Sequence, residues 1–159
     1  MSVPRRRLCP SLSRRATRAQ RGFTLIESLV AVAIVGVLSS IAYPSLEAQV
    51  QRARRMDALA ALLQLQLTEE RHRANNARYA TLAELGARDT SPSGHYRLQA
   101  SVNPSGGYEL VATAVAAQAR DARCRVLRLS LVDGALAQAS GSDAATANGT
   151  DANRACWSR

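Results

Sequence analysis

The sequence predicts an α+β fold, in which one long N-terminal helix packs on a small antiparallel sheet of three or four strands. Apolar residues fill the chain from Phe23 to Tyr43 and then recur at three- and four-residue steps as far as Leu67, which indicates a single long helix. Three later segments alternate between apolar and polar residues, which indicates half-buried strands. These segments are residues 95–102, 108–115 and 127–131.

The basic charge of the chain is concentrated at its N-terminus. All 21 basic residues are Arg, and seven of them precede Phe23 with no acid among them. Without residues 1–22, 14 Arg oppose 12 acids and the net charge falls from +9 to +2. We therefore predict that residues 1–22 form a basic leader that is removed. The charge of the whole chain then says little about what the mature protein binds.

The apolar run has the length of a membrane span. Residues 23–43 would form a helix about 31 Å long, which matches a bilayer core of about 30 Å. The basic leader should stay cytoplasmic, so the C-terminal part should be periplasmic. The leader ends before the apolar run, so cleavage at this junction would leave the span on the mature protein. We expect a membrane and assembly helix over 23–46 and a periplasmic globular domain over 47–159.

Glu27 is the one charged residue inside the apolar run. An intramembrane carboxylate costs at least a few kcal/mol unless it has a partner. Two interpretations are open. In the first, Glu27 lies near the edge of the membrane and extends its carboxylate to the lipid–water interface. In the second, it pairs with a positive group of another molecule. The best candidate for that group is the α-amino group that cleavage after Gly22 would create.

The helix should continue past Pro44 to about Arg73, with Asn75 and Asn76 as its stop. Pro44 should bend it or loosen it locally. We expect the sheet to pack on the 59–67 stretch. The recurring apolar residues of this half define a stripe. They are Leu46, Val50, Ala53, Ala60, Leu63 and Leu67.

The remaining segments connect the helix and the strands. Residues 76–93 should form a connection with one helical turn at 81–85, and 103–107 should turn between the first two strands. In the third strand Leu127, Leu129 and Leu131 should point inward. A turn at 132–134 then leads into a short segment, 135–139. Residues 140–153 are small and polar, which is typical of a surface loop.

Three cysteines occur, and Cys9 belongs to the leader. Cys124 and Cys156 form an even pair in the mature part, which predicts a disulfide in an oxidising compartment. The bridge would close a loop of about 30 residues and stabilise the fold by roughly 3–4 kcal/mol.

The run Gly22-Phe23-Thr24-Leu25-Ile26-Glu27 resembles the signal motif of type IV pilins. The resemblance implies that a prepilin peptidase cuts between Gly22 and Phe23 and then N-methylates Phe23. It also implies that Glu27 pairs with the N-terminus of a neighbouring subunit, and Pro44 matches a recurring proline of the family. The arginine-rich helix and the late Cys124–Cys156 pair resemble the PilE-like minor pilins.

The resemblance implies the type IV pilin fold and a structural role, that of a minor pilin supporting pilus assembly, twitching motility or adhesion. The implied partners are other pilin subunits, the prepilin peptidase and methyltransferase, and the assembly machinery of the inner membrane. The subunit would lie in the inner membrane before it enters the surface pilus. The sequence has no catalytic constellation, and we expect no enzyme activity, cofactor or metal.

Two alternatives remain open. The first is a DNA receptor for competence, since some minor pilins bind DNA and one basic cluster follows the second predicted strand. Its residues are Arg120, Arg123, Arg125 and Arg128. The second is a pseudopilin of a type II secretion system. The leader is longer than the family's usual leaders, which a start codon placed too far upstream would explain.

Overall fold

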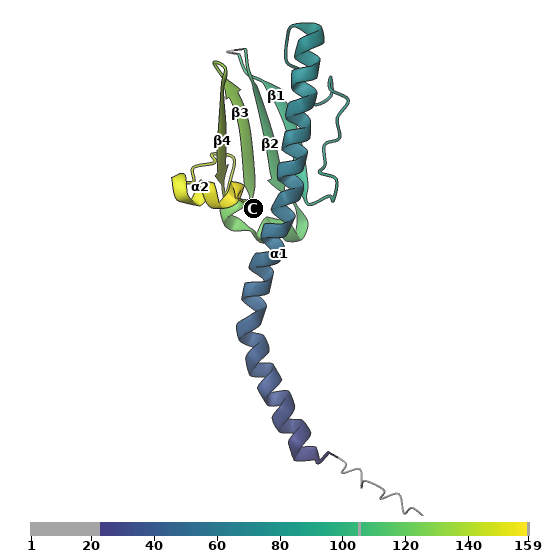
Figure 1. Cartoon of the computed structure of the whole chain (residues 1–159), viewed down its shortest axis with the longest axis vertical. Coiled ribbons are helices and arrows are strands. Elements are labelled where there is room, and N and C mark those ends of the chain that lie inside the picture. The colour runs from purple at the N-terminus through teal and green to yellow at the C-terminus, as the bar shows by residue number, and fades with distance from the viewer. Residues whose placement is uncertain (1–22, 105, 159) are drawn as a thin grey trace, which may run out of the picture. The chain divides into compact units, whose positions relative to one another are not determined.

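The computed structural model describes residues 23–104 and 106–158 (Figure 1). The leader and Cys9 lie outside the described residues. The chain divides into two units between Ser39 and Ser40. The elements are α1 (Leu25–Asn76), β1 (Tyr96–Val102), β2 (Tyr108–Ala114), η1 (Ala116–Arg120), η2 (Ala122–Cys124), β3 (Val126–Val132), β4 (Ala135–Gly141) and α2 (Thr150–Trp157).

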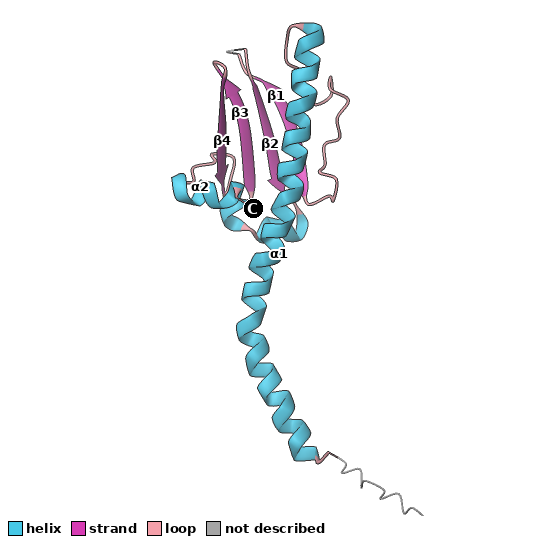
Figure 2. Cartoon of the chain, in the orientation of Figure 1, coloured by secondary structure: helices cyan, strands magenta, loops and turns pink. Residues whose placement is uncertain are grey.

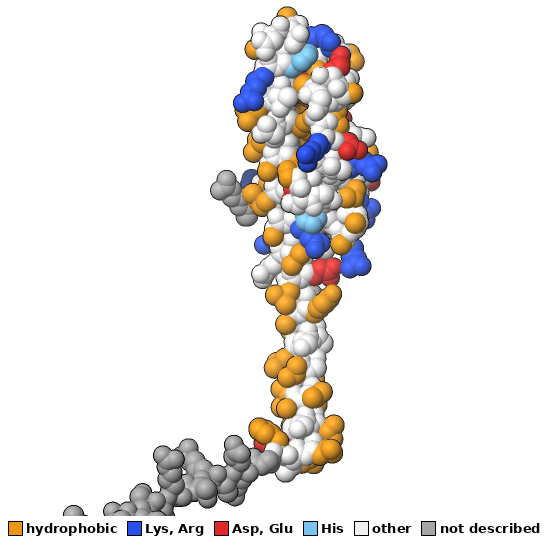
Figure 3. All heavy atoms as spheres, turned by 90° about the vertical axis from the view of Figure 1, so that its right-hand side faces the viewer, with side chains coloured by type: hydrophobic (Ala, Val, Ile, Leu, Met, Phe, Trp, Pro, Cys, Tyr) orange, Lys and Arg blue, Asp and Glu red, His pale blue; other side chains and the backbone are white. Residues whose placement is uncertain are grey.

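The described part of the first unit, residues 23–39, is the first part of α1 and its entry. Every side chain in it is exposed. Its surface is mostly hydrophobic, as the orange spheres along this stretch show (Figure 3). This stretch is therefore an apolar helix without a core of its own.

Helix α1 has 52 residues and stays helical through Pro44, as the continuous cyan ribbon shows (Figure 2). It ends at Asn76, which is the predicted stop and lies three residues beyond Arg73. Ala77 follows it in the left-handed conformation, with φ of 57°, and its N–H donates to the C=O of Arg73 at 2.8 Å. This geometry is a common way to end a helix.

The sheet is an antiparallel meander in the order β1-β2-β3-β4, which confirms the prediction of three or four strands. The predicted alternation is confirmed over most of these strands, but Val102 at the end of β1 is 43% exposed and Leu131 near the end of β3 is only partly buried. Tyr96, Tyr108 and Leu110 are fully buried on the inner face, and Leu127 and Leu129 continue this face on β3. The inner face packs against the second half of α1, and together they form the core.

The sheet packs on the 59–67 stretch of α1, as expected, but the apolar stripe listed from the sequence is not the side of the helix that faces the sheet. Ala58, Leu62 and Leu65 are buried against the sheet, whereas Leu63 and Leu67 are more than half exposed. The reason is that α1 is apolar on two sides, and both stripes have three- and four-residue spacing. Only the strands decide which of the two stripes becomes the core.

The prediction of a surface loop over 140–153 is wrong at both ends. Strand β4 reaches Gly141, and α2 begins at Thr150. The residues of α2 are mostly small and polar, so its sequence gives little helical signal. Tertiary contacts hold this helix instead. Asn153 donates its side-chain N–H to the C=O of Gln138 at 2.8 Å.

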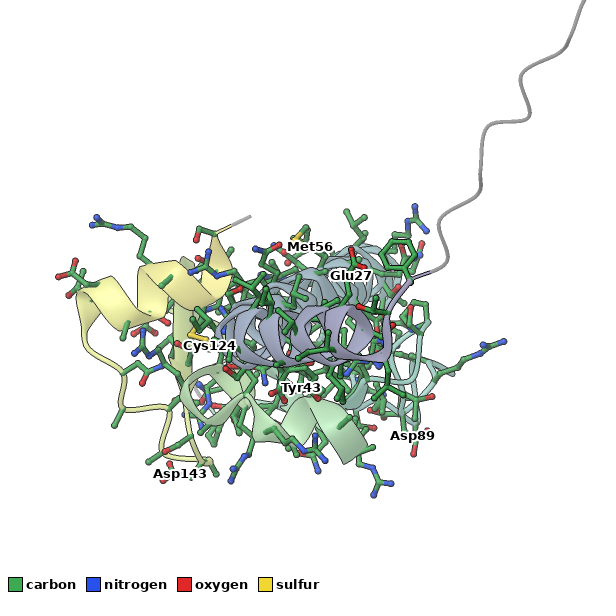
Figure 4. The ribbon with its side chains drawn as sticks, turned by 90° about the horizontal axis from the view of Figure 1, so that it is seen from below. Glu27, Tyr43, Met56, Asp89, Cys124 and Asp143 are labelled. Carbon is green, nitrogen blue, oxygen red and sulfur yellow. A yellow bond between two sulfur atoms is a disulfide. The ribbon has the colours of Figure 1, made fainter. Side chains whose placement is uncertain are left out.

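The predicted disulfide is confirmed. Cys124 at the end of η2 and Cys156 in α2 are bonded, with their Cα atoms 5.6 Å apart (Figure 4). Both residues are fully buried. The bridge therefore fastens α2 to the segment that leads into β3.

Candidate functional site

Glu27 lies in the first turn of α1 and is exposed (Figure 4). Its backbone N–H donates to Oγ1 of Thr24 at 3.3 Å, and Oγ of Ser28 donates to the C=O of Thr24 at 3.4 Å. The Thr24 hydroxyl thus satisfies one of the free N–H groups at the start of the helix. Within residues 23–104 and 106–158, no cation forms a salt bridge with the Glu27 carboxylate.

The surroundings of Glu27 are apolar and unpacked. The large apolar side chains from Phe23 to Ile41 are 53–81% exposed. Helix α1 contains a segment that is long and apolar enough to cross a membrane. One carboxylate therefore lies in a segment whose other side chains favour lipid or other helices over water.

The other residues predicted for processing and assembly are Gly22, Phe23 and Pro44. Phe23 immediately precedes α1 and is 81% exposed, and Gly22 lies outside the described residues. Pro44 is inside α1. Within the described part of the chain, no three His, Cys, Asp or Glu side chains gather as a metal site would require.

The four arginines that we considered as DNA contacts do not form one surface. Arg125 and Arg128 line a shallow hollow on the outer face of the sheet, together with Glu109 and Asp143. Arg120 lines a separate groove beside α1. Arg123 is exposed on η2.

Two of these arginines are engaged within the fold. Nε of Arg128 lies 3.6 Å from the Glu109 carboxylate, and the same guanidinium donates to the C=O of Ala144. Nε of Arg125 donates to the C=O of Ala119 at 3.0 Å. A phosphate at Arg128 would therefore compete with partners that the fold already provides.

Comparison with known proteins identifies the family. A family model described as type IV minor pilin ComP, DNA uptake sequence receptor, matches residues 44–128, and the prokaryotic N-terminal methylation motif matches residues 17–43. The chain belongs to the type IV pilin family. A fimbrial protein of Pseudomonas aeruginosa is 34% identical to this pilin over 106 residues, which cover 60% of the pilin and 69% of the relative.

Proteins of a secretion system are also similar to this pilin. The type II secretion system core protein G of Klebsiella pneumoniae is 36% identical over 90 residues, which cover 56% of the pilin and 63% of the relative. The core protein G of Dickeya chrysanthemi is 35% identical over 77 residues, which cover 48% and 50%. The matched region thus spans only about half to two thirds of the secretion relatives.

Sequence reasoning missed a buried ion pair that joins α1 to the rest of the pilin head, which we define as residues 40–159. Arg55 donates from Nε and from a terminal nitrogen to the two oxygens of Asp121, at 2.6 and 2.9 Å. The side chains are only 12% and 4% exposed. No local signal could have found this pair, since its members are 66 residues apart in the sequence.

Two acidic residues of α1 fasten the connection between α1 and β1, and both were missed. Asp57 accepts hydrogen bonds from the Ser91 hydroxyl at 2.5 Å and from the Ser93 N–H at 3.0 Å. Partial burial alone would raise the pKa of Asp57, but these hydrogen bonds and one from His95 outweigh it and lower the pKa. Asp57 therefore holds the end of the connection as an ionised carboxylate.

Glu69 holds the other end of this connection. Its Oε2 accepts the N–H of Ala80 at 3.0 Å, and the residue is fully buried. Burial raises the pKa of Glu69, against the effect of that hydrogen bond. In sequence, Asp57 and Glu69 are two of several acids on a charged helix, so periodicity could not single them out.

Proposed function

We propose that this pilin is a minor subunit of a type IV pilus. In this proposal a prepilin peptidase cuts between Gly22 and Phe23 and methylates the new N-terminus. The apolar part of residues 23–46 then holds the subunit in the inner membrane, with residues 47–159 in the periplasm, until the pilus machinery adds it to the filament. The match of residues 17–43 to the N-terminal methylation motif supports this order of events.

One observation carries the proposal: Glu27 is an acid, unpaired within the described chain, in an exposed apolar helix. Surrounded by other pilin helices, such a carboxylate would be costly without a counter-charge. Cleavage after Gly22 would put an α-amino group four residues before Glu27, about 6 Å along the helix. A neighbour's N-terminus at the level of Glu27 would satisfy the acid and set the axial register of the subunits.

The exposed stripe on the second half of α1 supports assembly with other pilin subunits. Leu46, Val50, Leu63 and Leu67 are 46–57% exposed, on the part of the helix that also packs on the sheet. Burial of apolar area stabilises association. Helices of neighbouring subunits would cover this stripe in a filament.

The test has two parts. Mass spectrometry of the mature protein should find methylated Phe23 as the first residue, and any other start would refute the processing step. In cells, Glu27→Gln should insert into the membrane normally but be depleted from sheared filaments. The control is Glu70→Gln, which changes an exposed acid in the second half of α1. Recovery of Glu27→Gln at the control level would refute the pairing role.

DNA uptake is a second candidate function, because the matching family model is described as a DNA uptake sequence receptor. Arg120 and Arg123 are exposed, and Arg125 is also exposed although its Nε is engaged. Fluorescence anisotropy of the detergent-solubilised chain with labelled duplex DNA tests this role. Replacing Arg123 and Arg125 by Gln should weaken DNA binding. It should also make a plot of the logarithm of the binding constant against the logarithm of the salt concentration less steep, by about 0.9 per lost phosphate contact. An unchanged slope would exclude these contacts.

The secretion relatives favour a third candidate, a pseudopilin of a type II secretion system. Deletion of the gene separates this role from the first proposal. Loss of secreted proteins from the medium with intact surface pili would favour secretion. Loss of pili with normal secretion would favour the pilus.

A further inference from the structure

A groove of about 290 Å³ lies between α1 and η1, at the end of the apolar segment. One side is apolar and open to solvent: Tyr43, Leu46 and Val50 are 68%, 57% and 46% exposed. The polar side carries Arg54 and Arg120. In Figure 4, Tyr43 lies on the side of α1 that faces the pale green ribbon of η1 and η2. The volume is near the lower end of the range for small-molecule sites, about 300–1,000 Å³.

The two walls are held together by a buried amide. Gln118 of η1 is 1% exposed and donates from Nε2 to the C=O of Gln51 in α1 at 3.1 Å. The same nitrogen lies 3.1 Å from the hydroxyl of Tyr96 in the core. The groove is therefore a fixed feature of the head.

The charge of the groove favours an anion. Arg120 approaches Glu47 at 3.8 Å, but the two side chains are 73% and 40% exposed, so this ion pair contributes little. Within the described part of the chain, Arg54 forms no ion pair. Two guanidinium groups thus face one carboxylate, and both can donate to a further anion.

The distance along α1 from the end of the apolar run places the groove at the level of the lipid headgroups. The apolar run ends at Tyr43, and tyrosine is enriched at membrane interfaces. Glu47, beside Arg120, follows about 6 Å later, and Arg54 about 16 Å later. The headgroup layer is about 5–8 Å thick on each side of the hydrocarbon core. The Arg120 guanidinium therefore falls within this layer, and the long Arg54 side chain can reach back to its outer edge.

We propose that this groove binds the headgroup of an anionic phospholipid while the pilin is stored in the membrane. The phosphodiester oxygens accept hydrogen bonds from Arg54 and Arg120, for which the planar guanidinium is well suited. The first carbons of the acyl chains cover Tyr43, and the glycerol backbone of the lipid covers Leu46, about 4.5 Å further along the helix. A nucleic acid would satisfy the arginines but would leave this apolar wall in water, which favours the lipid. The proposal rests on membrane storage but on no step of filament assembly.

The test is a lipid titration of the delipidated, detergent-solubilised full chain, followed by native mass spectrometry. Phosphatidylglycerol should bind roughly twentyfold more tightly than zwitterionic phosphatidylcholine, and each arginine should account for about fivefold of that preference. Arg54→Gln with Arg120→Gln should abolish the preference. Glu47→Gln should increase it, because it removes the competing carboxylate.

The control replaces Arg88 and Arg97, two exposed arginines that do not line this groove, by Gln and should leave the preference unchanged. Equal binding of the two lipids, or an unchanged preference in the Arg54 and Arg120 double variant, would overturn the proposal. Competition by free glycerol 3-phosphate as strong as that by the lipid would also overturn it. Flotation of the same proteins with vesicles tests membrane insertion separately. If the protein does not float with the vesicles, the proposal of membrane storage is refuted, whatever the lipid preference.

Discussion

Replacing Arg55 by Ala should destabilise the head of this pilin by about 3–5 kcal/mol. Arg55 contacts both oxygens of Asp121 and also donates to the C=O of Ala155 at 3.2 Å. One side chain thus links α1 to the segment before β3 and to the C-terminal helix. Its removal weakens three parts of the fold together.

The magnitude follows from the burial of Asp121. Its side chain is only 4% exposed, so after the substitution the carboxylate would keep the Gln118 amide, at 3.3 Å, as its remaining side-chain partner. Breaking a buried ion pair by removing one partner typically costs about 3–5 kcal/mol. A solvated surface pair would cost only about 0–1 kcal/mol. The two cases are far enough apart to measure.

Urea denaturation of the detergent-solubilised chain, with the disulfide intact, measures this loss. Trp157 is the only tryptophan, and its indole N–H donates to the C=O of Ala139 at 3.3 Å, so its fluorescence reports on the packing of α2 against β4. The control is Arg52→Ala, an exposed arginine one turn earlier in α1. It should change stability by less than about 0.5 kcal/mol.

A loss below about 1 kcal/mol for Arg55→Ala would refute the reasoning, because it would mean that the pair is effectively solvated. A double variant gives a second check. Arg55→Leu with Asp121→Leu should be more stable than Arg55→Leu alone, since it leaves no buried charge without a partner. If the second substitution adds a further loss, the two residues are not coupled as proposed.

Three further predictions concern other parts of the pilin. Replacing Cys124 and Cys156 by Ala should cost about 4 kcal/mol in urea denaturation, from their separation of 32 residues; a loss below about 1 kcal/mol would contradict the chain-entropy argument. Hydrogen bonds lower the pKa of Asp57 below its usual 3.8, so the folded state binds this proton less tightly than the unfolded chain. The stabilisation should therefore be complete above pH 3.8 and be lost as the pH falls further, and Asp57→Asn should remove this part of the acid dependence. If the two acid profiles are parallel, the assignment to Asp57 is wrong. Leu63→Glu should leave the head's stability within about 0.5 kcal/mol but deplete the pilin from sheared filaments; normal recovery would mean that the exposed stripe is not an interface.

The predictions that succeeded rest on local patterns. The apolar run is visible directly in the sequence, the helix end near Asn76 follows from the Asn75-Asn76 stop, and the alternation of Leu127 and Leu129 follows from two-residue spacing. These signals are local, so the chain carries them without reference to its fold. The pairing of Cys124 with Cys156 was accessible for another reason. These are the only two cysteines after the leader, so one connectivity is possible.

The tertiary structure decided three features that residue spacing does not specify: the buried face of α1, the buried ion pair and the formation of α2. Two apolar stripes on α1 have the same period, and only the position of the sheet separates the buried Leu62 from the exposed Leu63. The ion pair of Arg55 with Asp121 joins residues 66 positions apart, and burial gives it its strength. Helix α2 forms from residues of low helical propensity because the disulfide and its contacts with β4 hold it. Periodicity thus fixes the long helix and the first three strands, whereas burial, which depends on distant parts of the chain, decides whether α2 forms, which face of α1 is covered and which charges are buried.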